Sequence, residues 1–478
     1  MIKKVLFCIP PFPNRYGLPT HPHTGIGYLS QSLEVNGIES RVVDFRLGNG
    51  YEILRRTIEE FKPDLFGVTV MTYYHNLAYE IVGFLKQFDK PIAVGGPHVS
   101  TLKEVAVKES GADYGFMNEA EISLVEFCKG KPLKQIDGLI YRQNKKLKIN
   151  QPMIIEELDL IPFPKYKNVD MSQYTRKRVP IISSRGCPYQ CIFCPISTVM
   201  GKRYRFRSAE NIFSELKYWY DIGYRDFDFQ DDNFTVNKER VYRLFDLIEK
   251  AKMKDLFMQC GNGIRADLST EELLKRMKDV GFKAIAFGVE TFDSEVLVRV
   301  KKGETNKQIE KAVKMALKVG LEVSLFFIVG LPGETTKTFK KSIDFALKYP
   351  ISTATFYNLI PFPGTELFKW VTDNGLFILQ PNNYLNTIAH LEFVPIFETK
   401  DFTAEERKKA LVLGSWVNME LKRRDMTRKL GGLAIAFLLS WLIYKTFLTK
   451  VIFRMIKIGP IKRLINFVLL KLKLRLNL

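Results

Sequence analysis

The sequence predicts an α/β protein built from two successive sheets and a basic helical tail. Short β-branched runs alternate with amphipathic stretches over residues 1–130 and again over residues 179–375, and this alternation is typical of parallel sheets. A chain of 478 residues that is 46% hydrophobic and 26% charged is globular and too long for one core. We therefore expect two domains, a linker at residues 131–178 and a C-terminal helical extension at residues 376–478.

The first domain, residues 1–130, contains five strand-like runs separated by helical stretches: KKVLFCIP, ESRVVDF, LFGVTVMT, PIAVGG and ADYGFM. This order predicts a doubly wound parallel sheet that resembles the flavodoxin-like fold, and such sheets bind ligands at the carboxyl ends of their strands. Glycine in the loops at these ends lets a flat ligand approach the backbone closely. The candidate binding residues of this domain are Gly25, Thr69, Thr72, Gly95 and Gly96.

The linker carries the charged run RQNKKLKIN and the proline-studded LDLIPFPKY. From Val179 the alternation resumes with six strand-like runs: VPIISS, DFDFQDD, LFMQCGNG, FKAIAFGVE, EVSLFFIVG and TATFYNLI. Six β/α units predict a partial (β/α)6 barrel, and chemistry in barrels gathers at the carboxyl ends of the strands. The candidates at these ends are Asp231, Asp232, Arg265, Glu290 and Gly330.

Three of the six cysteines, Cys187, Cys191 and Cys194, lie within eight residues in SSRGCPYQCIFCPIST, after the first barrel strand. Their spacing disfavours disulfides, and the absence of a signal peptide predicts a reducing compartment. No second CxxC or HxxxH lies nearby to complete a zinc site. Three thiolates suit a 4Fe-4S cluster with one iron left open to a small molecule. Structural cysteines in a buried turn are the alternative, and we assign the remaining cysteines to packing: Cys8, Cys128 and Cys260.

The CxxxCxxC spacing resembles the signature of radical S-adenosylmethionine enzymes. Upstream, GGPHVSTLKEVAVKESGADYGFMNEAEISLVEF resembles the cobalamin-binding domain that precedes the barrel in one large class of these enzymes. The resemblance covers residues 1–375 and implies three cofactors, a 4Fe-4S cluster, S-adenosylmethionine and cobalamin, together with an external electron donor.

The sequence departs from that class at its acidic turn and, as is common in the class, lacks the histidine loop of classical cobalamin proteins. The acidic turn reads Asn118-Glu119-Ala120-Glu121 where Gly-Glu-Gly-Glu is usual, which weakens any role assigned to the turn. The DxHxxG loop that supplies a lower axial histidine is absent. His21 and His23 lie in the corresponding loop, where we expect a solvated pair, with cobalt ligation or proton relay as the alternative.

The resemblance also implies roles at the barrel. Glu290 in FGVET resembles the acid after the fourth strand, and Asp231 and Asp232 in DDNFT resemble the acidic motif after the second. Either acid could hold the amino group of S-adenosylmethionine, although one aspartate could instead cap the next helix. Arg265 could neutralise the carboxylate. Gly330 in IVGLPGE resembles the glycine-rich turn that meets adenine.

The tail is basic and amphipathic. Residues 421–478 carry 14 Lys and Arg against one acid, Asp425, so that this segment holds +13 of the net charge of +20. An uncharged stretch at residues 430–444 is short of the ~20 residues that span a bilayer. Basic residues interleaved with apolar ones favour a membrane interface over nucleic acid. We expect a cytoplasmic enzyme attached to the membrane peripherally or by its tail; a helical subdomain docked on the barrel is the alternative.

These observations predict a cobalamin-dependent radical S-adenosylmethionine methyltransferase. The cofactors carry the difficult chemistry, and the membrane-held position suggests an apolar small-molecule substrate such as a lipid, an isoprenoid or a tetrapyrrole. Radical cyclisation or rearrangement is the alternative within the class. A non-catalytic iron-sulfur or cobalamin sensor is the alternative outside it, against which Glu290 and the glycine turn argue because a sensor needs no S-adenosylmethionine pocket.

Overall fold

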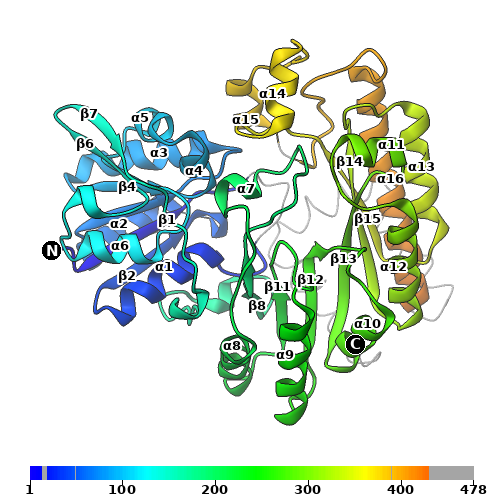
Figure 1. Ribbon diagram of the computed structural model, residues 1–478. Helices are drawn as coiled ribbons and strands as arrows, with labels where there is room; N and C mark the ends of the chain where they lie inside the picture. Colours follow the sequence, from blue (N-terminus) through cyan, green and yellow to red (C-terminus); the bar gives the residue numbers. More distant parts are fainter. Residues whose placement is uncertain (13–18, 49, 389, 430–478) are drawn as a thin grey trace, which may run out of the picture.

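The computed structural model describes residues 1–12, 19–48, 50–388 and 390–429 (Figure 1). Two α/β units lie side by side, the N-terminal unit on the left of Figure 1 and the second on the right. The predicted α/β class is therefore correct. The apolar stretch at residues 430–444 and the basic segment after it lie outside the described residues, so their membrane association stays a prediction.

The N-terminal sheet has seven strands in the order β2-β1-β3-β4-β5-β6-β7. The first five strands in the chain are parallel, and their 2-1-3-4-5 order is that of the flavodoxin-like fold, as predicted. They are β1 (Lys4–Ile9), β2 (Glu39–Asp44), β3 (Leu65–Thr69), β4 (Ile92–Gly95) and β5 (Tyr114–Phe116).

The last two strands of this sheet correct the predicted linker. Strands β6 (Leu139–Gln143) and β7 (Lys146–Ile149) form an antiparallel hairpin that extends the sheet from β5, so the sheet is mixed and not purely parallel. Asn144 and Lys145 turn the hairpin with φ of 49° and 65°, the left-handed conformation that a two-residue hairpin turn requires. The edge strand β7 is mostly exposed, which is why its sequence is polar and does not resemble a strand.

Helices cover both faces of this sheet and bury a separate apolar core on each. Along β1, Leu6 and Cys8 join one core while Val5, Phe7 and Ile9 join the other, as the two-residue period of a strand dictates. The helices are α1 (Thr24–Val35), α2 (Gly50–Phe61), α3 (His75–Leu85), α4 (Pro97–Leu102), α5 (Glu104–Ser110) and α6 (Glu121–Cys128).

The second sheet has six parallel strands in the order β15-β14-β13-β12-β11-β8, and its edge strands β8 and β15 do not pair with each other. This is the open six-unit arrangement that the sequence predicts. The strands are β8 (Arg178–Ile181), β11 (Asp226–Phe229), β12 (Phe257–Ile264), β13 (Phe282–Glu290), β14 (Glu322–Val329) and β15 (Thr353–Asn358).

Helices follow each strand and cover the outer face of this sheet (Figure 1). Several begin at a side chain that caps their first backbone N–H groups, such as Ser208, Asn237 and Thr305. They are α8 (Ala209–Asp221), α9 (Lys238–Lys250), α10 (Glu271–Asp279), α11 (Ser294–Arg299), α12 (Asn306–Lys318) and α13 (Thr336–Lys348).

A small ribbon interrupts the pattern after β8. Strands β9 (Ser184–Arg185) and β10 (Arg205–Phe206) pair in antiparallel fashion and bracket the cysteine loop together with the short helix α7 (Ile196–Val199). The connecting segments contain 3-10 turns at Phe45–Leu47, Lys86–Phe88, Leu133–Gln135, Leu158–Leu160 and Met171–Gln173.

The C-terminal part joins the two units. Helices α14 (Glu366–Asp373) and α15 (Pro381–Thr387) lead to a contact with the N-terminal unit, where the Tyr74 N–H donates to the Leu385 carbonyl at 2.6 Å. Helix α16 (Ala404–Lys429) then packs along β15 and α13. A Cβ at Gly414 would lie 2.5 Å from the Phe356 ring, so glycine permits this close approach.

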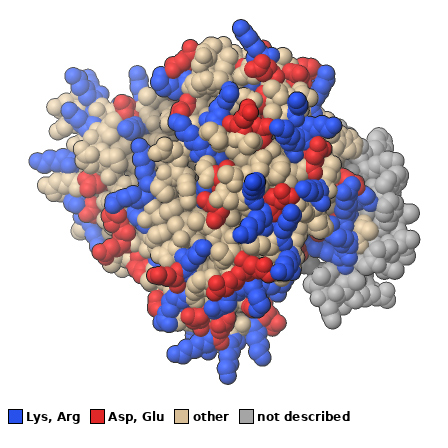
Figure 2. Space-filling model, turned by 45° about the vertical axis from the view of Figure 1, so that its right-hand side comes forward, with Lys and Arg blue, Asp and Glu red and all other residues tan. Residues whose placement is uncertain are grey.

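Residues 404–429 thus dock on the barrel, whereas the segment for which a docked helical subdomain is the alternative lies almost wholly outside the described residues. Within the part of the chain that the structure describes, no helix combines the length and apolar character that a bilayer-spanning segment needs. On the face shown in Figure 2, basic and acidic side chains are interspersed.

Candidate cofactor sites

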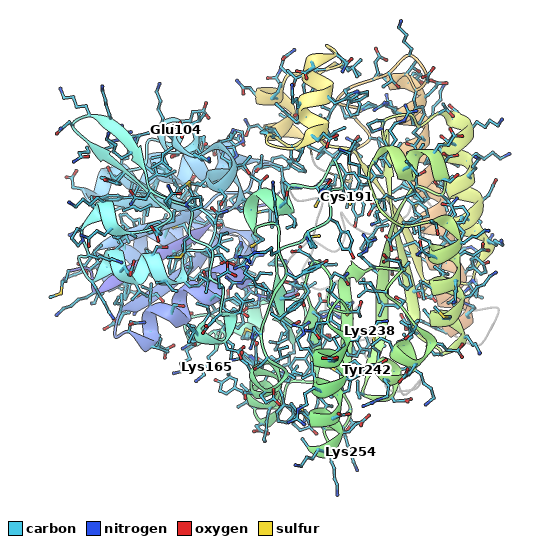
Figure 3. All side chains as sticks on the ribbon, viewed as in Figure 1. Glu104, Lys165, Cys191, Lys238, Tyr242 and Lys254 are labelled. Carbon is cyan, nitrogen blue, oxygen red and sulfur yellow. The ribbon has the colours of Figure 1, made fainter. Side chains whose placement is uncertain are left out.

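The cysteine loop lies at the carboxyl ends of the second sheet. Cys187, Cys191 and Cys194 are free thiols that line one cavity of about 540 Å³, and Cys191 is labelled in Figure 3. The Cys187 N–H donates to the Gly201 carbonyl at 3.2 Å, which closes the loop. Gly186 precedes the loop with a φ of 88°, and a Cβ there would lie 2.2 Å from the Arg203 carbonyl oxygen. Only glycine allows this turn.

The loop fits an iron-sulfur cluster in its chemistry. Among the described residues no group of three His, Cys, Asp or Glu side chains is already arranged to hold a metal ion, so ligation requires the thiols to converge. Burial raises the pKa of Cys194 to about 12 and also raises the pKa of Cys191, and metal ligation requires both as thiolates. Three thiols on one loop that face one cavity match a 4Fe-4S cluster with an open iron.

An ion pair lies across the same cavity. Glu290 ends β13 with a φ of 62°, and its carboxylate lies 2.9 Å from the Lys302 ammonium, which is also 3.4 Å from Glu304. Burial opposes the charge on Lys302, but Glu290 and Glu304 outweigh it and raise the pKa of the lysine. A Cβ at Gly288 would lie 2.7 Å from the Glu290 carboxylate and 3.0 Å from the Lys302 nitrogen, so a glycine leaves room for the pair.

Arg265 lines this cavity, but its donors are already engaged. Its guanidinium makes two bonds of 3.0 Å to Asp267 and donates to the carbonyls of Lys302 and Gly303. The guanidinium also lies 3.6 Å from the centre of the Tyr189 ring. Lys302 is a second cation in this cavity, itself paired with Glu290 and Glu304, and strand-end patterns do not reveal it because it follows the short helix α11.

The two adjacent aspartates differ in position. Asp231 is buried and does not line the cavity of the cysteine loop. It accepts hydrogen bonds from the Ser183 N–H at 2.6 Å, the Ser184 hydroxyl at 2.7 Å and the Ser183 hydroxyl. It therefore fastens the β11 loop to the end of β8 and is not placed to hold a cofactor. Asp232 lines the cavity of the three cysteines, which we call the cluster cavity. Burial by surrounding protein and the neighbouring Asp231 raise the pKa of Asp232 to about 7. Neither caps α9, because Asn237 does.

Gly330 also falls outside the cavity lining. Its N–H donates to the Glu334 carboxylate at 2.6 Å, and a Cβ there would lie 2.6 Å from the Arg407 guanidinium of α16. Arg407 of α16 thus packs against this turn on the side away from the cluster cavity. Because Gly330 does not line that cavity, its predicted contact with adenine has no support here.

The remaining wall of the cluster cavity is apolar. Along β14, Val323, Leu325 and Phe327 are buried toward the helices, so the alternate residues face the cavity. The apolar side chains of this wall come from β14, β15 and the loop after β15: Phe326, Ile328, Tyr357, Leu359, Ile360 and Phe362.

His390 closes this wall. Its ring lies 6.1 Å from Tyr357, 5.6 Å from Phe362 and 6.0 Å from Tyr73 of the N-terminal unit, measured between ring centres. Burial lowers the pKa of His390 and so disfavours its charged form. Sequence patterns carry no signal for this residue, because it lies in an irregular segment far from any motif.

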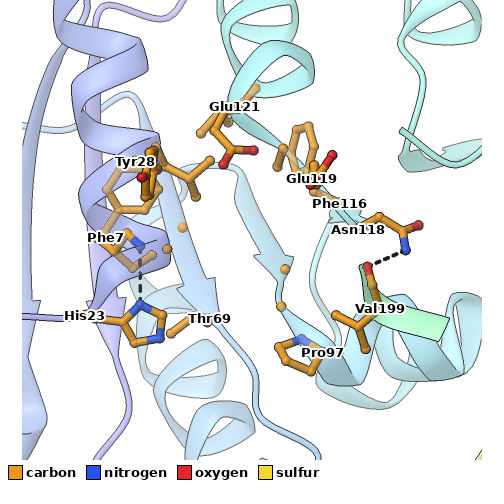
Figure 4. Close-up of a pocket in the computed structure, with 18 of the residues that line it drawn as sticks. Phe7, His23, Tyr28, Thr69, Pro97, Phe116, Asn118, Glu119, Glu121 and Val199 are labelled. Carbon is orange, nitrogen blue, oxygen red and sulfur yellow. Dashed lines mark hydrogen bonds between the residues drawn. The ribbon is translucent and has the colours of Figure 1, made fainter. Parts of the chain in front are cut away.

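A second cavity of about 290 Å³ lies at the carboxyl ends of β1, β3 and β4 (Figure 4). Its apolar walls include Val5, Phe7 and Leu65 from the strands themselves. Gly96 turns there with a φ of 102°, and a Cβ on it would lie 2.9 Å from the Val70 carbonyl oxygen. An apolar slot with bare backbone at its rim suits an apolar face of a large cofactor such as cobalamin. Four of the predicted residues line it, Gly25, Thr69, Gly95 and Gly96, and Thr72 does not.

The two histidines of the first loop are not a solvated pair, because both rings are partly buried and hydrogen-bonded. His23 Nδ1 accepts from the Ile26 N–H at 3.2 Å and caps α1, which assigns its proton to Nε2. Burial lowers the pKa of His23 to about 4. The His21 ring lies 2.8 Å from both the Pro22 carbonyl and the Gln230 amide nitrogen. Neither ring offers a free lone pair to cobalt.

Comparisons with known proteins identify the family of this chain. The chain matches the model of the radical SAM superfamily over residues 181–346 and that of the B12 binding domain over residues 17–127. It is 32% identical over 429 residues to an uncharacterized methyltransferase of Pyrococcus horikoshii, a match that covers 86% of this chain and 91% of the relative. It is 26% identical over 303 residues to the hopanoid C-2 methylase of Rhodopseudomonas palustris, covering 63% and 55%.

Two solved structures share the fold. The radical S-adenosylmethionine methyltransferase TsrM of Kitasatospora setae, with cobalamin and a 4Fe-4S cluster bound, matches with a TM-score of 0.69 at 18% identity and covers 86% of this chain and 82% of its own. The cobalamin-dependent S-adenosylmethionine radical enzyme OxsB matches with a TM-score of 0.72 at 15% identity and covers 96% and 75%.

The chain therefore belongs to the cobalamin-dependent radical S-adenosylmethionine methyltransferases, enzymes whose cofactors are a 4Fe-4S cluster, S-adenosylmethionine and cobalamin. The predicted family, enzyme class and cofactors are confirmed. The alternative of a non-catalytic sensor has no support.

Proposed function

We propose that the protein methylates an unactivated carbon of an apolar small molecule. The observation that carries this proposal is the division of the cluster cavity into a polar half, with the thiols, Glu290 and Lys302, and an apolar half on β14 and β15. S-adenosylmethionine needs the polar half for its amino and carboxylate groups. The apolar half is left for the substrate, and burial of an apolar ligand there is favourable.

The names of relatives support an apolar substrate in part. They include a hopanoid methylase and, at 23% identity over 400 residues, the bacteriochlorophyllide d C-8(2)-methyltransferase of Chlorobaculum tepidum, which covers 78% of this chain and 83% of the relative. A phosphonate methyltransferase of Streptomyces wedmorensis is also among the relatives. Because these relatives differ in substrate, the proposed apolar substrate class depends on the cavity wall of this chain. The names of the relatives favour methyl transfer over cyclisation.

Within this proposal the chain's own residues hold and orient the cofactors. The bound cofactors supply a carbon-centred radical and a transferable methyl group, and an external donor supplies the electron. Cys187, Cys191 and Cys194 hold the cluster. Glu290 accepts hydrogen bonds from the amino group of S-adenosylmethionine, and Lys302 faces its carboxylate. Residues 1–149, with the four loop residues that line the second cavity, form the cobalamin-binding domain.

The test compares cells with and without the gene. Lipid and pigment extracts of the deletion strain should lack a methylated compound, and purified enzyme with methyl-labelled S-adenosylmethionine should label the corresponding fraction under anaerobic, reducing conditions. Protein with all three cluster cysteines replaced by alanine is the control and should form no deoxyadenosine. An unchanged lipid and pigment profile, with a change among water-soluble metabolites, would overturn the apolar-substrate proposal.

The cavity wall gives a sharper version of this test. Phe326→Asp places a charge in the apolar half and should abolish labelling of the apolar fraction while deoxyadenosine still forms without substrate. Leu413→Asp, on the exposed face of α16, is the matched control because Leu413 is 48% exposed and outside the cavity. Equal labelling by wild type and Phe326→Asp would show that the wall does not bind the substrate.

A further inference from the structure

The acidic turn between β5 and α6 contacts the barrel through buried charges. Glu119 and Glu121 are only 2% and 7% exposed. Arg185 donates to Glu119 at 3.1 Å and to Glu121 at 2.6 Å, and Arg205 donates to the other oxygen of Glu119 at 2.6 Å. The Ile155 N–H donates to Glu119 as well, at 2.5 Å. Both carboxylates also line the cobalamin cavity (Figure 4).

The two arginines close the loop that carries the cluster cysteines. Arg185 ends β9, two residues before Cys187, and Arg205 begins β10 after the loop. The two residues lie directly opposite each other in the antiparallel ribbon. The carboxylate of Glu119 therefore pairs with an arginine on each of the two strands that flank the cysteine loop.

The same turn also holds the helix at the end of the loop. The Asn118 amide donates to the Thr198 carbonyl at 3.1 Å and to the Val199 carbonyl at 2.8 Å, and the second bond is drawn in Figure 4. These carbonyls end α7, where they have no partner within the helix. The φ of Asn118 is 58°, a left-handed conformation that asparagine tolerates better than most residues.

Helix α7 forms part of the boundary between the two cofactor cavities. Its first residue, Ile196, lines both cavities, and among the residues that the structure describes only Asp232 does the same. A carbon that reacts with groups held in both cavities has to lie at this boundary. The turn thus fixes the loop that holds one cofactor, the wall beside the substrate and part of the cavity for the other cofactor.

Such a buried network is better suited to fixing geometry than to adding stability. Desolvation of four charges cancels much of their attraction, whereas directed hydrogen bonds between them permit only one arrangement. Precise placement matters for this reaction, because a displacement of ~1 Å can cost about 100-fold in rate.

We propose that the turn Asn118–Glu121 is a positioning element that sets the separation of the cluster and the cobalamin and so couples radical formation to methyl transfer. The proposal rests on the cofactor sites of the proposed function. Asn118, Glu119 and Glu121 act through the ribbon and α7, and radical formation by itself needs only the barrel.

The test uses full-length protein loaded with all cofactors. Glu121→Asp keeps every charge but withdraws the carboxylate by one methylene, and Glu119→Gln removes the charge shared by both arginines. Asp226→Glu is the matched control, because Asp226 pairs with Arg178 at 2.7 Å between two strands of the second sheet, so that its length changes by one methylene away from the turn. Pulsed electron paramagnetic resonance gives the distance distribution between cob(II)alamin and the reduced cluster, and chromatography gives the label moved from S-adenosylmethionine to cobalamin.

In Glu121→Asp we expect, per bound cobalamin, a shifted or broadened distance distribution and label transfer reduced about 10-fold relative to deoxyadenosine formation. Asp226→Glu should match the wild type in both. An unchanged distribution and unchanged label transfer in both turn variants would overturn the proposal; if Glu119→Gln does not fold, Glu121→Asp decides alone. Failure of the proposed function looks different, since the wild type itself would then bind no cobalamin or form no deoxyadenosine.

Discussion

His98 gives a quantitative prediction about pH and stability. It lies at the start of α4 with 0% exposure, its ring stacks on His75 with centres 4.4 Å apart, and Nε2 lies 3.0 Å from the Tyr79 hydroxyl. Burial and, second, the charge of His75 lower the pKa of His98 from 6.5 to about 3. The folded protein therefore holds this ring neutral at any ordinary pH.

The sign and size of the effect follow from this shift. Because the pKa of His98 is lower in the folded state, the unfolded chain binds the proton first, and stability that is fully present above pH 6.5 is lost as the pH falls toward 3. Between pH 7.5 and pH 5.5 the unfolded ring becomes mostly protonated while the folded ring does not. The free energy of unfolding should therefore drop by about 1.4 kcal/mol from His98 alone.

The assay is urea denaturation of wild type and His98→Gln at the two pH values. The glutamine side chain would keep a partner for the Tyr79 hydroxyl without titrating, so the variant should lose about 1.4 kcal/mol less than wild type on acidification. Tyr79→Phe is the control and should keep the wild-type pH dependence. With only five histidines in the chain, ring-labelled nuclear magnetic resonance resolves them. An imidazole of His98 that titrates near pH 6.5, or equal losses in wild type and variant, would refute the reasoning.

Three further predictions concern the sites and the tail. Lys302→Met should lower the free energy of unfolding by about 3–5 kcal/mol, because it leaves Glu290 and Glu304 buried without a cation. Adding Glu290→Gln should recover part of this loss. A loss near zero in urea denaturation would contradict the ion pair. Bound cob(II)alamin should show no nitrogen splitting in its electron paramagnetic resonance spectrum, since His23 carries its proton on Nε2; a three-line splitting would contradict this. Deleting residues 430–478 should preserve α16 and deoxyadenosine formation. In co-sedimentation the shortened protein should no longer bind anionic liposomes, and retained binding would refute a membrane role for the tail.

The sequence was sufficient for the strands of both sheets, because buried parallel strands read as continuous β-branched and aromatic runs. It was insufficient for the hairpin of β6 and β7, because the edge strand β7 is mostly exposed and carries the charged residues Lys146 and Lys148. The ribbon of β9 and β10 was also missed, since two residues per strand carry no periodic pattern and their pairing depends on contacts distant in the chain.

The candidate site was predictable where chemistry depends on spacing within one segment. The cysteine motif and Glu290 are such cases, and the structure places both in one cavity. The sequence alone does not distinguish the roles of the adjacent residues Asp231 and Asp232. Only the fold shows that Asp231 accepts hydrogen bonds from serines while Asp232 faces the cluster cavity. Lys302 and His390 join the site through the end of α11 and a loop, positions that no local pattern reveals.

The ribbon that closes the cysteine loop has a consequence for maturation. Two-stranded ribbons are marginally stable alone, and this one has only two residue pairs. Its anchor, Glu119, precedes Arg205 by 86 residues and belongs to the domain that leaves the ribosome first. The anchor of the cysteine loop is therefore synthesised before the ribbon that it holds, so the N-terminal domain has its own sheet and cores available when the ribbon closes.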